Sequence, residues 1–382
     1  MKIHFNSNTK NYLPSSRSSE GVLEFHWRMP DYKPSPLISL PHLANRFKLG
    51  EISVKAETSR FGLAAFKILG ASFAVWKVLQ EKFSIAWESW HSIDQLRELV
   101  RPYLPLKFVS ATDGNHGRGV ARMAGMLNIQ ARIFLPINAT PARIAAIASE
   151  GAEVTVVDGS YDDAVSAAEE TQSDRAILIQ DTSQPGYEKV NNWIIEGYST
   201  IFQELELAGY APPDFIFVQI GVGSLAASVI DHYKPQPDSR VKVISVEPMT
   251  AACALESVEK GEIIQLTSRQ DTIMAGLNCG TPSAAAWEAL YHGIDCFLAI
   301  EDDWSAAAMR ELATVSLHTS ESGAAGLAGL MALCLDPLTQ EYRNLLALND
   351  RSRILLLITE GIIDAPVRRK TMEVPEEPNY NF

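Results

Sequence analysis

Short apolar, β-branched runs alternate with longer amphipathic stretches along most of the chain. From residue 107 onward we expect the apolar runs to form buried strands, at 107–110, 132–135, 153–157, 176–179, 214–218, 241–246 and 353–358. Helix-like segments lie near 115–127, 140–150 and 161–172. Continuous apolar strands separated by helices are typical of parallel sheets that are covered on both faces. The pattern therefore predicts an α/β protein with two open, mostly parallel sheets that are flanked by helices and face one cleft.

The length of the chain favours two domains in one compact body, because it has 382 residues and a domain takes about 150. Hydrophobic residues make up 46% and charged residues 21%, a mixture that excludes a mainly disordered chain. Residues 1–35 carry many polar and proline positions, and 373–382 form an acidic, proline-containing tail. We expect both ends to be peripheral.

The charge balance excludes several classes of partner. Lys and Arg number 33 against 46 Asp and Glu, and the net charge of −13 repels nucleic acid and anionic lipid surfaces. No apolar run reaches the roughly 18 residues of a membrane helix, and the polar N-terminus lacks an apolar signal segment. The sequence therefore predicts a cytoplasmic protein with neither a membrane nor a nucleic-acid partner.

The cysteine and histidine patterns favour no metal site. The cysteines contain no C-x-x-C pair, which in a chain of this length indicates buried, reduced thiols rather than a disulfide framework or zinc ligands. They are Cys253, Cys279, Cys296 and Cys334. None of the eight histidines lies in an H-E-x-x-H motif.

Lys67 is the only charged residue in the apolar stretch 62–74. Burial there would lower the pKa of its amine, and a neutral amine is the nucleophile that a Schiff base with a carbonyl compound requires. The alternative is an ordinary solvated lysine, which is what we expect of Lys77 at the more polar end of the same helix.

Two glycine-rich turns and one strand end offer places for a ligand. Residues 111–119 follow a strand and open a helix, where glycines allow close backbone approach and helix-start amides suit an anion. Residues 219–225 repeat this arrangement, and Thr359 ends the last apolar strand, at the edge where open α/β sheets bind ligands. Taken singly, each motif is equally well explained as a tight turn, and His116 as a packing residue.

In this order, the lysine in an apolar helix, the G-N-H-G turn, the second glycine loop and the strand-end hydroxyl resemble the fold-type II pyridoxal-phosphate enzymes. These include the serine and threonine dehydratases and the cysteine synthases. The closer resemblance, over roughly residues 35–365, is to the diaminopropionate ammonia-lyases. It rests on the segments 59–67, 111–121, 180–187, 246–248, 272–277 and 320–324.

The resemblance implies an architecture and a set of site residues. A large cofactor-binding domain would comprise 1–85 and 205–382, and a smaller domain, 86–204, would carry the substrate loop, with the active site between them. A homodimer is also implied. The implied cofactor-binding residues are Lys67, Asn115, Gly221, Val222, Gly223, Ser224, Leu225 and Thr359. The implied substrate-binding residues are Thr112, Asp113, Gly114, His116 and Asp181.

Each of these residues has an implied chemical role. Lys67 would bind pyridoxal 5′-phosphate as a Schiff base and later serve as a base, and Asn115 would hydrogen-bond the cofactor's 3′ oxygen. The loop 221–225 would hold the phosphate at a helix N-terminus, where amides and helix dipole favour an anion. Thr359 would accompany the pyridine nitrogen, and a neutral hydroxyl there favours β-elimination. The amides of 112–116 would receive the substrate carboxylate, and Asp181 the substrate's amino group.

Asp113 stands where related dehydratases carry Ser or Thr. A carboxylate near the α-carbon can act as a second base on the face opposite Lys67, or attract a β-ammonium group. The alternative is a helix N-cap. With Lys67 it forms the expected catalytic pair of a carbon–nitrogen lyase, which converts the small amino acid 2,3-diaminopropionate (D, L or both) into pyruvate and ammonia.

The chain also departs from the lyase pattern. Gln184 and Pro185 replace the Trp and Glu of D-T-A-W-E-G-Y, and Ile362 replaces the last residue of S-T-E-G-D. These changes leave open a serine or threonine dehydratase or a β-replacement synthase on the same scaffold, within a biosynthetic pathway. Two other classes remain: a nucleotide-binding oxidoreductase built on 221–224, which leaves Lys67 unexplained, and a non-catalytic cofactor-binding protein.

Overall fold

The computed structural model describes residues 1–112, 114–182, 186–235, 239–268 and 270–362. Asp113, Gln184, Pro185 and the tail 373–382 lie outside these residues.

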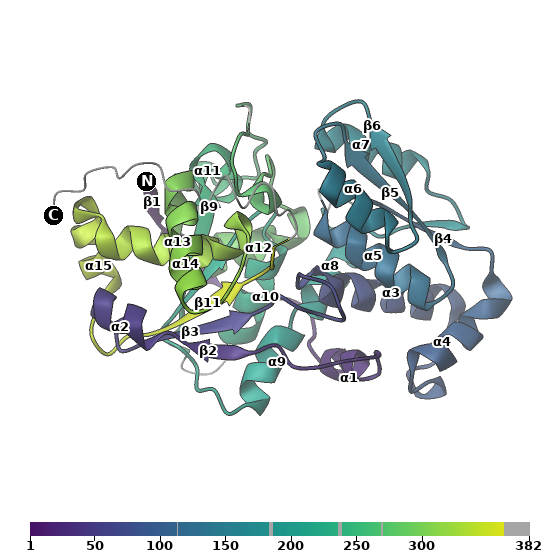
Figure 1. Ribbon diagram of the computed structural model, residues 1–382, viewed down its shortest axis with the longest axis horizontal. Coiled ribbons are helices and arrows are strands. Elements are labelled where there is room, and N and C mark those ends of the chain that lie inside the picture. Colours follow the sequence, from purple (N-terminus) through teal and green to yellow (C-terminus); the bar gives the residue numbers. More distant parts are fainter. Residues whose placement is uncertain (113, 183–185, 236–238, 269, 363–382) are drawn as a thin grey trace.

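Within these ranges the strands form two sheets, which lie side by side in Figure 1. The larger has the order β1-β10-β9-β8-β11-β3-β2, and the smaller β6-β5-β4-β7. The strands of the larger sheet are β1 (Lys2–Phe5), β2 (Leu37–Ser39), β3 (Glu51–Ala56), β8 (Phe215–Gln219), β9 (Lys242–Pro248), β10 (Cys296–Ile300) and β11 (Arg353–Ile358). Those of the smaller sheet are β4 (Lys107–Ala111), β5 (Gln130–Pro136), β6 (Glu153–Val157) and β7 (Ala176–Leu178).

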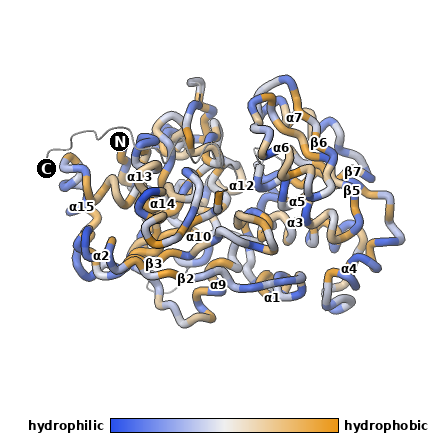
Figure 2. Tube along the Cα trace, viewed as in Figure 1, coloured by the Kyte–Doolittle hydropathy of each residue, from blue (hydrophilic) through white to orange (hydrophobic). Residues whose placement is uncertain are grey.

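All pairings in the smaller sheet are parallel, and in the larger sheet only the edge strands β1 and β2 run antiparallel. Neighbouring residues of β8 belong to different hydrophobic clusters: Phe215 and Phe217 pack with α14 (Glu321–Leu335), and Ile216 and Val218 with α10 (Ser224–Tyr233). Apolar colour accordingly follows strands such as β3 in Figure 2. The larger sheet is therefore covered on both faces, and the predicted fold class is confirmed.

The remaining helices lie singly or in groups of two or three between successive strands of the chain. They are α1 (Val22–Trp27), α2 (Pro41–Phe47), α3 (Lys67–Phe83), α4 (Ile93–Val100), α5 (Asn115–Met126), α6 (Pro141–Ala148), α7 (Tyr161–Glu170), α8 (Glu188–Gly197), α9 (Thr200–Leu207), α11 (Cys253–Lys260), α12 (Ala284–Gly293), α13 (Asp302–Thr314) and α15 (Gln340–Leu346). Among the described helices, none is by itself both long and apolar enough to cross a membrane.

The N-terminal residues are not peripheral, contrary to the expectation from their composition. β1 pairs with β10 at the edge of the larger sheet, and Phe25 and His26 of α1 are fully buried. His26 contacts the Thr200 hydroxyl and the Leu69 carbonyl, at 2.7 and 3.1 Å. Buried residues are thus interspersed among the polar residues of this N-terminal segment, and its average composition does not reveal them.

Helix α3, which follows β3 of the larger sheet, packs against both α5 and α8, which follow strands β4 and β7 of the smaller sheet. Its crossing with α8 requires glycine: a Cβ on Gly70 would lie 2.7 Å from the Ile194 carbonyl oxygen, and one on Gly197 2.7 Å from the Gly70 Cα. Because α8 also contacts α10 and α12, it joins both halves, and the proposed domain boundary at 204/205 stays a prediction.

Candidate active site

Lys67 is the first residue of α3, and the chain before it is fixed to the end of β11. The Phe66 amide donates to the Thr359 carbonyl at 3.2 Å, and the Gly361 amide to the Ala64 carbonyl at 2.8 Å. The lysine therefore starts its helix beside the segment that follows β11 and carries Thr359.

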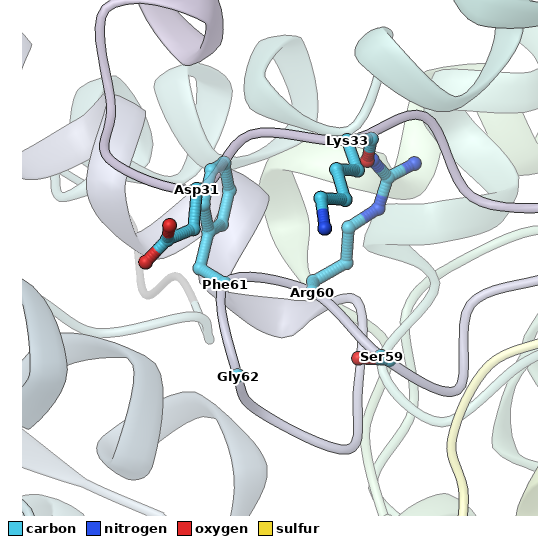
Figure 3. A pocket seen from close by; sticks show the side chains of 6 residues that line it. All are labelled: Asp31, Lys33, Ser59, Arg60, Phe61 and Gly62. Atoms are coloured by element: carbon cyan, nitrogen blue, oxygen red, sulfur yellow. The ribbon is translucent and has the colours of Figure 1, made fainter.

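A tight turn precedes Lys67 and is anchored by Arg60. The backbones of Arg60 and Leu63 exchange hydrogen bonds of 2.7 and 2.8 Å around Phe61 and Gly62, whose φ angles are +50° and +77°. The Arg60 side chain is 1% exposed and lies beside Lys33, whose carbonyl accepts a 3.1 Å hydrogen bond from it (Figure 3). A pocket of about 230 Å³ on this turn is lined by Asp31, Lys33, Ser59, Arg60, Phe61 and Gly62.

Four buried charges hold this turn to the larger sheet. Arg60 donates to both Glu57 and Glu204, with the shortest distance 2.6 Å in each case, and Lys55 lies 2.6 Å from Glu204. Two cations thus neutralise two carboxylates within the protein interior, the arrangement in which buried charges are tolerated.

Lys67 forms an ion pair with Asp181, which lies just after β7 of the smaller sheet. Its Nζ is 2.7 Å from Asp181 Oδ2, and the His116 Nδ1 lies 3.8 Å from the same oxygen. Burial alone would raise the pKa of Asp181, but the positive charges of His116 and Lys67 outweigh it and lower that pKa. The structure thus brings together Lys67, His116 and Asp181, which are far apart in sequence.

The turn between β4 and α5 is closed by Thr112. Its hydroxyl accepts from the amides of Gly114 and Gly117 at 2.9 and 3.2 Å, while its own amide donates to the Phe134 carbonyl at 3.0 Å. The Thr112 amide is therefore not available to a substrate carboxylate, although the amides of residues 112–116 were all expected to receive it. The His116 ring is buried and lies 2.9 Å from the Ile179 carbonyl.

Asn115 opens α5 and reaches across to the end of β11. Its Nδ2 donates to Glu360 Oε2, and Ser320 donates to the other oxygen of the same carboxylate. Glu360 was not among the predicted site residues. The only sequence signal for it is the T-E-G segment after the last strand, because its partners are 40 and 245 residues away.

The loop between β8 and α10 has the form of an anion cradle. Gly223, with φ +101°, is the N-cap of α10, and the Ser224 hydroxyl is buried without a hydrogen-bond partner among the described residues. A Cβ on Gly221 would lie 3.1 Å from the Gly276 carbonyl oxygen and 3.2 Å from Cys279 Sγ. A buried hydroxyl at a helix N-terminus in a glycine loop suits a phosphate group.

Thr359 is buried at the end of β11 and accepts a 2.9 Å hydrogen bond from Gln219 Nε2. The Gln219 Oε1 atom is buried with no partner among the described residues. The expected cofactor thus fits the donor set: a lysine amine, an uncommitted hydroxyl in the glycine loop and a neutral hydroxyl at the strand end. No cluster of three or more His, Cys, Asp or Glu in the described ranges is arranged to hold a metal ion.

Comparisons with known proteins agree with this geometry. The family model described as pyridoxal-phosphate dependent enzyme matches residues 29–360. The diaminopropionate ammonia-lyase of Salmonella typhimurium is 35% identical over 94% of this chain and 95% of that protein. Two structures of the Escherichia coli diaminopropionate ammonia-lyase are similar over 97% of this chain and 96% of theirs, at 34% identity. One is in complex with D-serine (TM-score 0.88) and the other with an aminoacrylate-PLP azomethine reaction intermediate (TM-score 0.87).

Proposed function

This chain belongs to the family of pyridoxal-phosphate dependent enzymes, and we propose that it is a lyase that eliminates ammonia from 2,3-diaminopropionate. Similarity to diaminopropionate ammonia-lyases over almost the full length of both chains favours this reaction over the dehydratase and β-replacement alternatives. The structural observation that carries the proposal is Lys67, whose amine is held by Asp181 where elements of both sheets meet.

The reaction breaks two bonds of the substrate. The α-carbon loses its proton, the bond between the β-carbon and its nitrogen breaks, and ammonia leaves. The resulting aminoacrylate reacts with one water to give pyruvate and a second ammonia. Pyridoxal phosphate, when bound, supplies the conjugated ring that makes the α-proton acidic.

Lys67 and Asp181 act on protons and charge at this site. Lys67 Nζ is the group that would bind the cofactor, and as a free amine it would take the α-proton of the substrate. Asp181, with its lowered pKa, stays ionised and holds ammonium groups, whether of Lys67 or of the substrate. A β-ammonium group leaves already protonated, so this site needs no acid for the leaving group, whereas the hydroxyl of serine requires one.

The other residues position the reactants. Asn115 would bind the cofactor's 3′ oxygen, Thr359 would face the pyridine nitrogen, and the loop 221–225 would hold the phosphate. Asp113 is proposed as the second base, which would admit the enantiomer whose α-hydrogen points away from Lys67. The homodimer and the cytoplasmic location inferred from the sequence also stay proposals.

Pyruvate formation by the purified holoenzyme tests the proposed reaction. We expect pyruvate to form faster from 2,3-diaminopropionate than from serine or threonine. Lys67→Ala should abolish this activity, while Lys77→Ala, ten residues along the same helix with its amine on Gln80, should retain it. Faster turnover of serine or threonine would identify a dehydratase, and no pyruvate from any of the three would contradict the lyase proposal.

A further inference from the structure

Glu360 connects elements of the two sheets through one buried carboxylate. It follows β11 of the larger sheet and is 8% exposed. One carboxylate oxygen accepts from Nδ2 of Asn115, which opens the helix after β4 of the smaller sheet. The other accepts from the hydroxyl of Ser320, the N-cap of α14. This carboxylate takes no part in the proposed reaction.

The backbone of Glu360 is fixed independently of its side chain. Its carbonyl accepts a 2.6 Å hydrogen bond from the Thr319 hydroxyl, and its backbone forms a bridge with Ala65, two residues before Lys67. The Ser320 oxygen accepts from the Gly323 amide at 3.1 Å, so the hydroxyl proton is directed to Glu360. The carboxylate therefore presents its second oxygen to Asn115 from a defined position.

An ionised carboxylate only accepts hydrogen bonds, and this determines which end of the Asn115 amide faces it. The amide nitrogen carries two hydrogens, so one N–H can donate to Glu360 and the other to a second acceptor, while the amide oxygen points elsewhere. Without Glu360 the amide is free to turn over and present its oxygen, which an electron-rich cofactor oxygen would repel.

We propose that Glu360 is a positioning residue that orients the Asn115 amide so that its second N–H meets the cofactor's 3′ oxygen. This inference rests on the proposed function, because it assumes that Asn115 binds the cofactor. Glu360 thereby couples cofactor binding to the contact between α5 and the end of β11. Its action runs through Asn115 and not through direct contact with the substrate.

A double-mutant cycle on cofactor affinity tests the proposal. The four proteins are wild type, Glu360→Ala, Asn115→Ala and the double variant, and the readout is the dissociation constant for pyridoxal phosphate from absorbance titration of the apoproteins. Hydrogen bonds to a charged group are stronger than those between neutral groups. We therefore expect Glu360→Ala to weaken binding at least about tenfold in the wild-type background. In the Asn115→Ala background it should change binding less than about twofold.

Two further variants separate positioning from folding. Glu360→Gln can still offer an oxygen to Asn115 and should recover most of the affinity. Thr339→Val removes a buried hydroxyl that donates to the Leu333 and Asp336 carbonyls. These lie at the C-terminal end of α14, the end opposite to Ser320. The substitution should lower thermal stability without changing cofactor affinity.

Equal weakening by Glu360→Ala in both backgrounds, or none in the wild type, would overturn the inference about Glu360. Failure of the wild-type protein to bind pyridoxal phosphate on a lysine would refute the proposed function instead. The two results are distinguishable, because the first is a comparison between variants and the second concerns the wild type alone.

Discussion

Replacing Gly223 with alanine should both destabilise the fold and disturb the proposed phosphate cradle. Gly223 adopts φ +101°, where a Cβ costs about 1–2 kcal/mol. The new methyl would also lie 2.5 Å from Leu290 Cδ1 and 3.4 Å from the Ala286 Cβ, and overpacking of this kind costs about 1–3 kcal/mol. The two contributions together predict a loss of about 2–5 kcal/mol in the free energy of unfolding.

Gly209 provides a matched control. It also has a positive φ, +70°, but a Cβ there would have no heavy atom within 4 Å. Gly209→Ala should therefore lose only the backbone contribution of about 1–2 kcal/mol. Because Gly209 lies between α9 and β8, away from the glycine loop, its substitution should leave cofactor affinity unchanged.

Urea unfolding of the apoproteins measures the stability difference, and absorbance titration with pyridoxal phosphate measures affinity. The positive φ at residue 223 and the Leu290 contact both act on the loop that carries the Ser224 hydroxyl. We therefore expect Gly223→Ala to bind the cofactor at least about tenfold more weakly, the effect of losing one hydrogen bond to a charged group. Wild-type affinity in a folded Gly223→Ala protein would refute the assignment of this loop to the phosphate.

Two other predictions concern residues elsewhere in the chain. Asp113→Asn should lower turnover of D-diaminopropionate by at least about a hundredfold, the scale of losing a general base, and affect the L enantiomer much less. Equal losses for both enantiomers would indicate that Asp113 binds the β-ammonium group, and no loss for either would indicate that it is a helix cap. Burial lowers the pKa of His26 to about 3, so its imidazole is neutral in the folded protein. In the unfolded chain the same imidazole takes up a proton below pH 6.5, so His26 contributes to a fall in stability as the pH drops from 6.5 toward 3. His26→Gln should flatten that part of the profile of urea midpoints against pH, and an unchanged slope would argue against a neutral buried imidazole.

The sequence predicted best those elements whose signal is local. The continuous apolar runs that became β4 to β9 and β11 needed no knowledge of distant residues. In contrast, β3 was not predicted, because E-I-S-V-K-A mixes polar with apolar residues. The buried charge of Lys55 in this strand is neutralised by Glu204, 149 residues away.

The same distinction holds within the site. Lys67 and the glycine loops could be proposed from the sequence because their chemistry lies within short motifs. Glu360 and Gln219 could not, since their importance depends on contacts with Asn115 and Thr359 across 245 and 140 residues. Long-range hydrogen bonds between polar residues leave no periodic pattern, so only the folded structure reveals them.

The measurement that tests the central claim most directly is reductive trapping of the cofactor. Borohydride reduction of the holoenzyme should fix the pyridoxyl group to its lysine, and peptide mapping should then find that mass on the peptide containing Phe66, Lys67 and Ile68. Label on Lys77 or on any other lysine, or no label at all, would contradict the account.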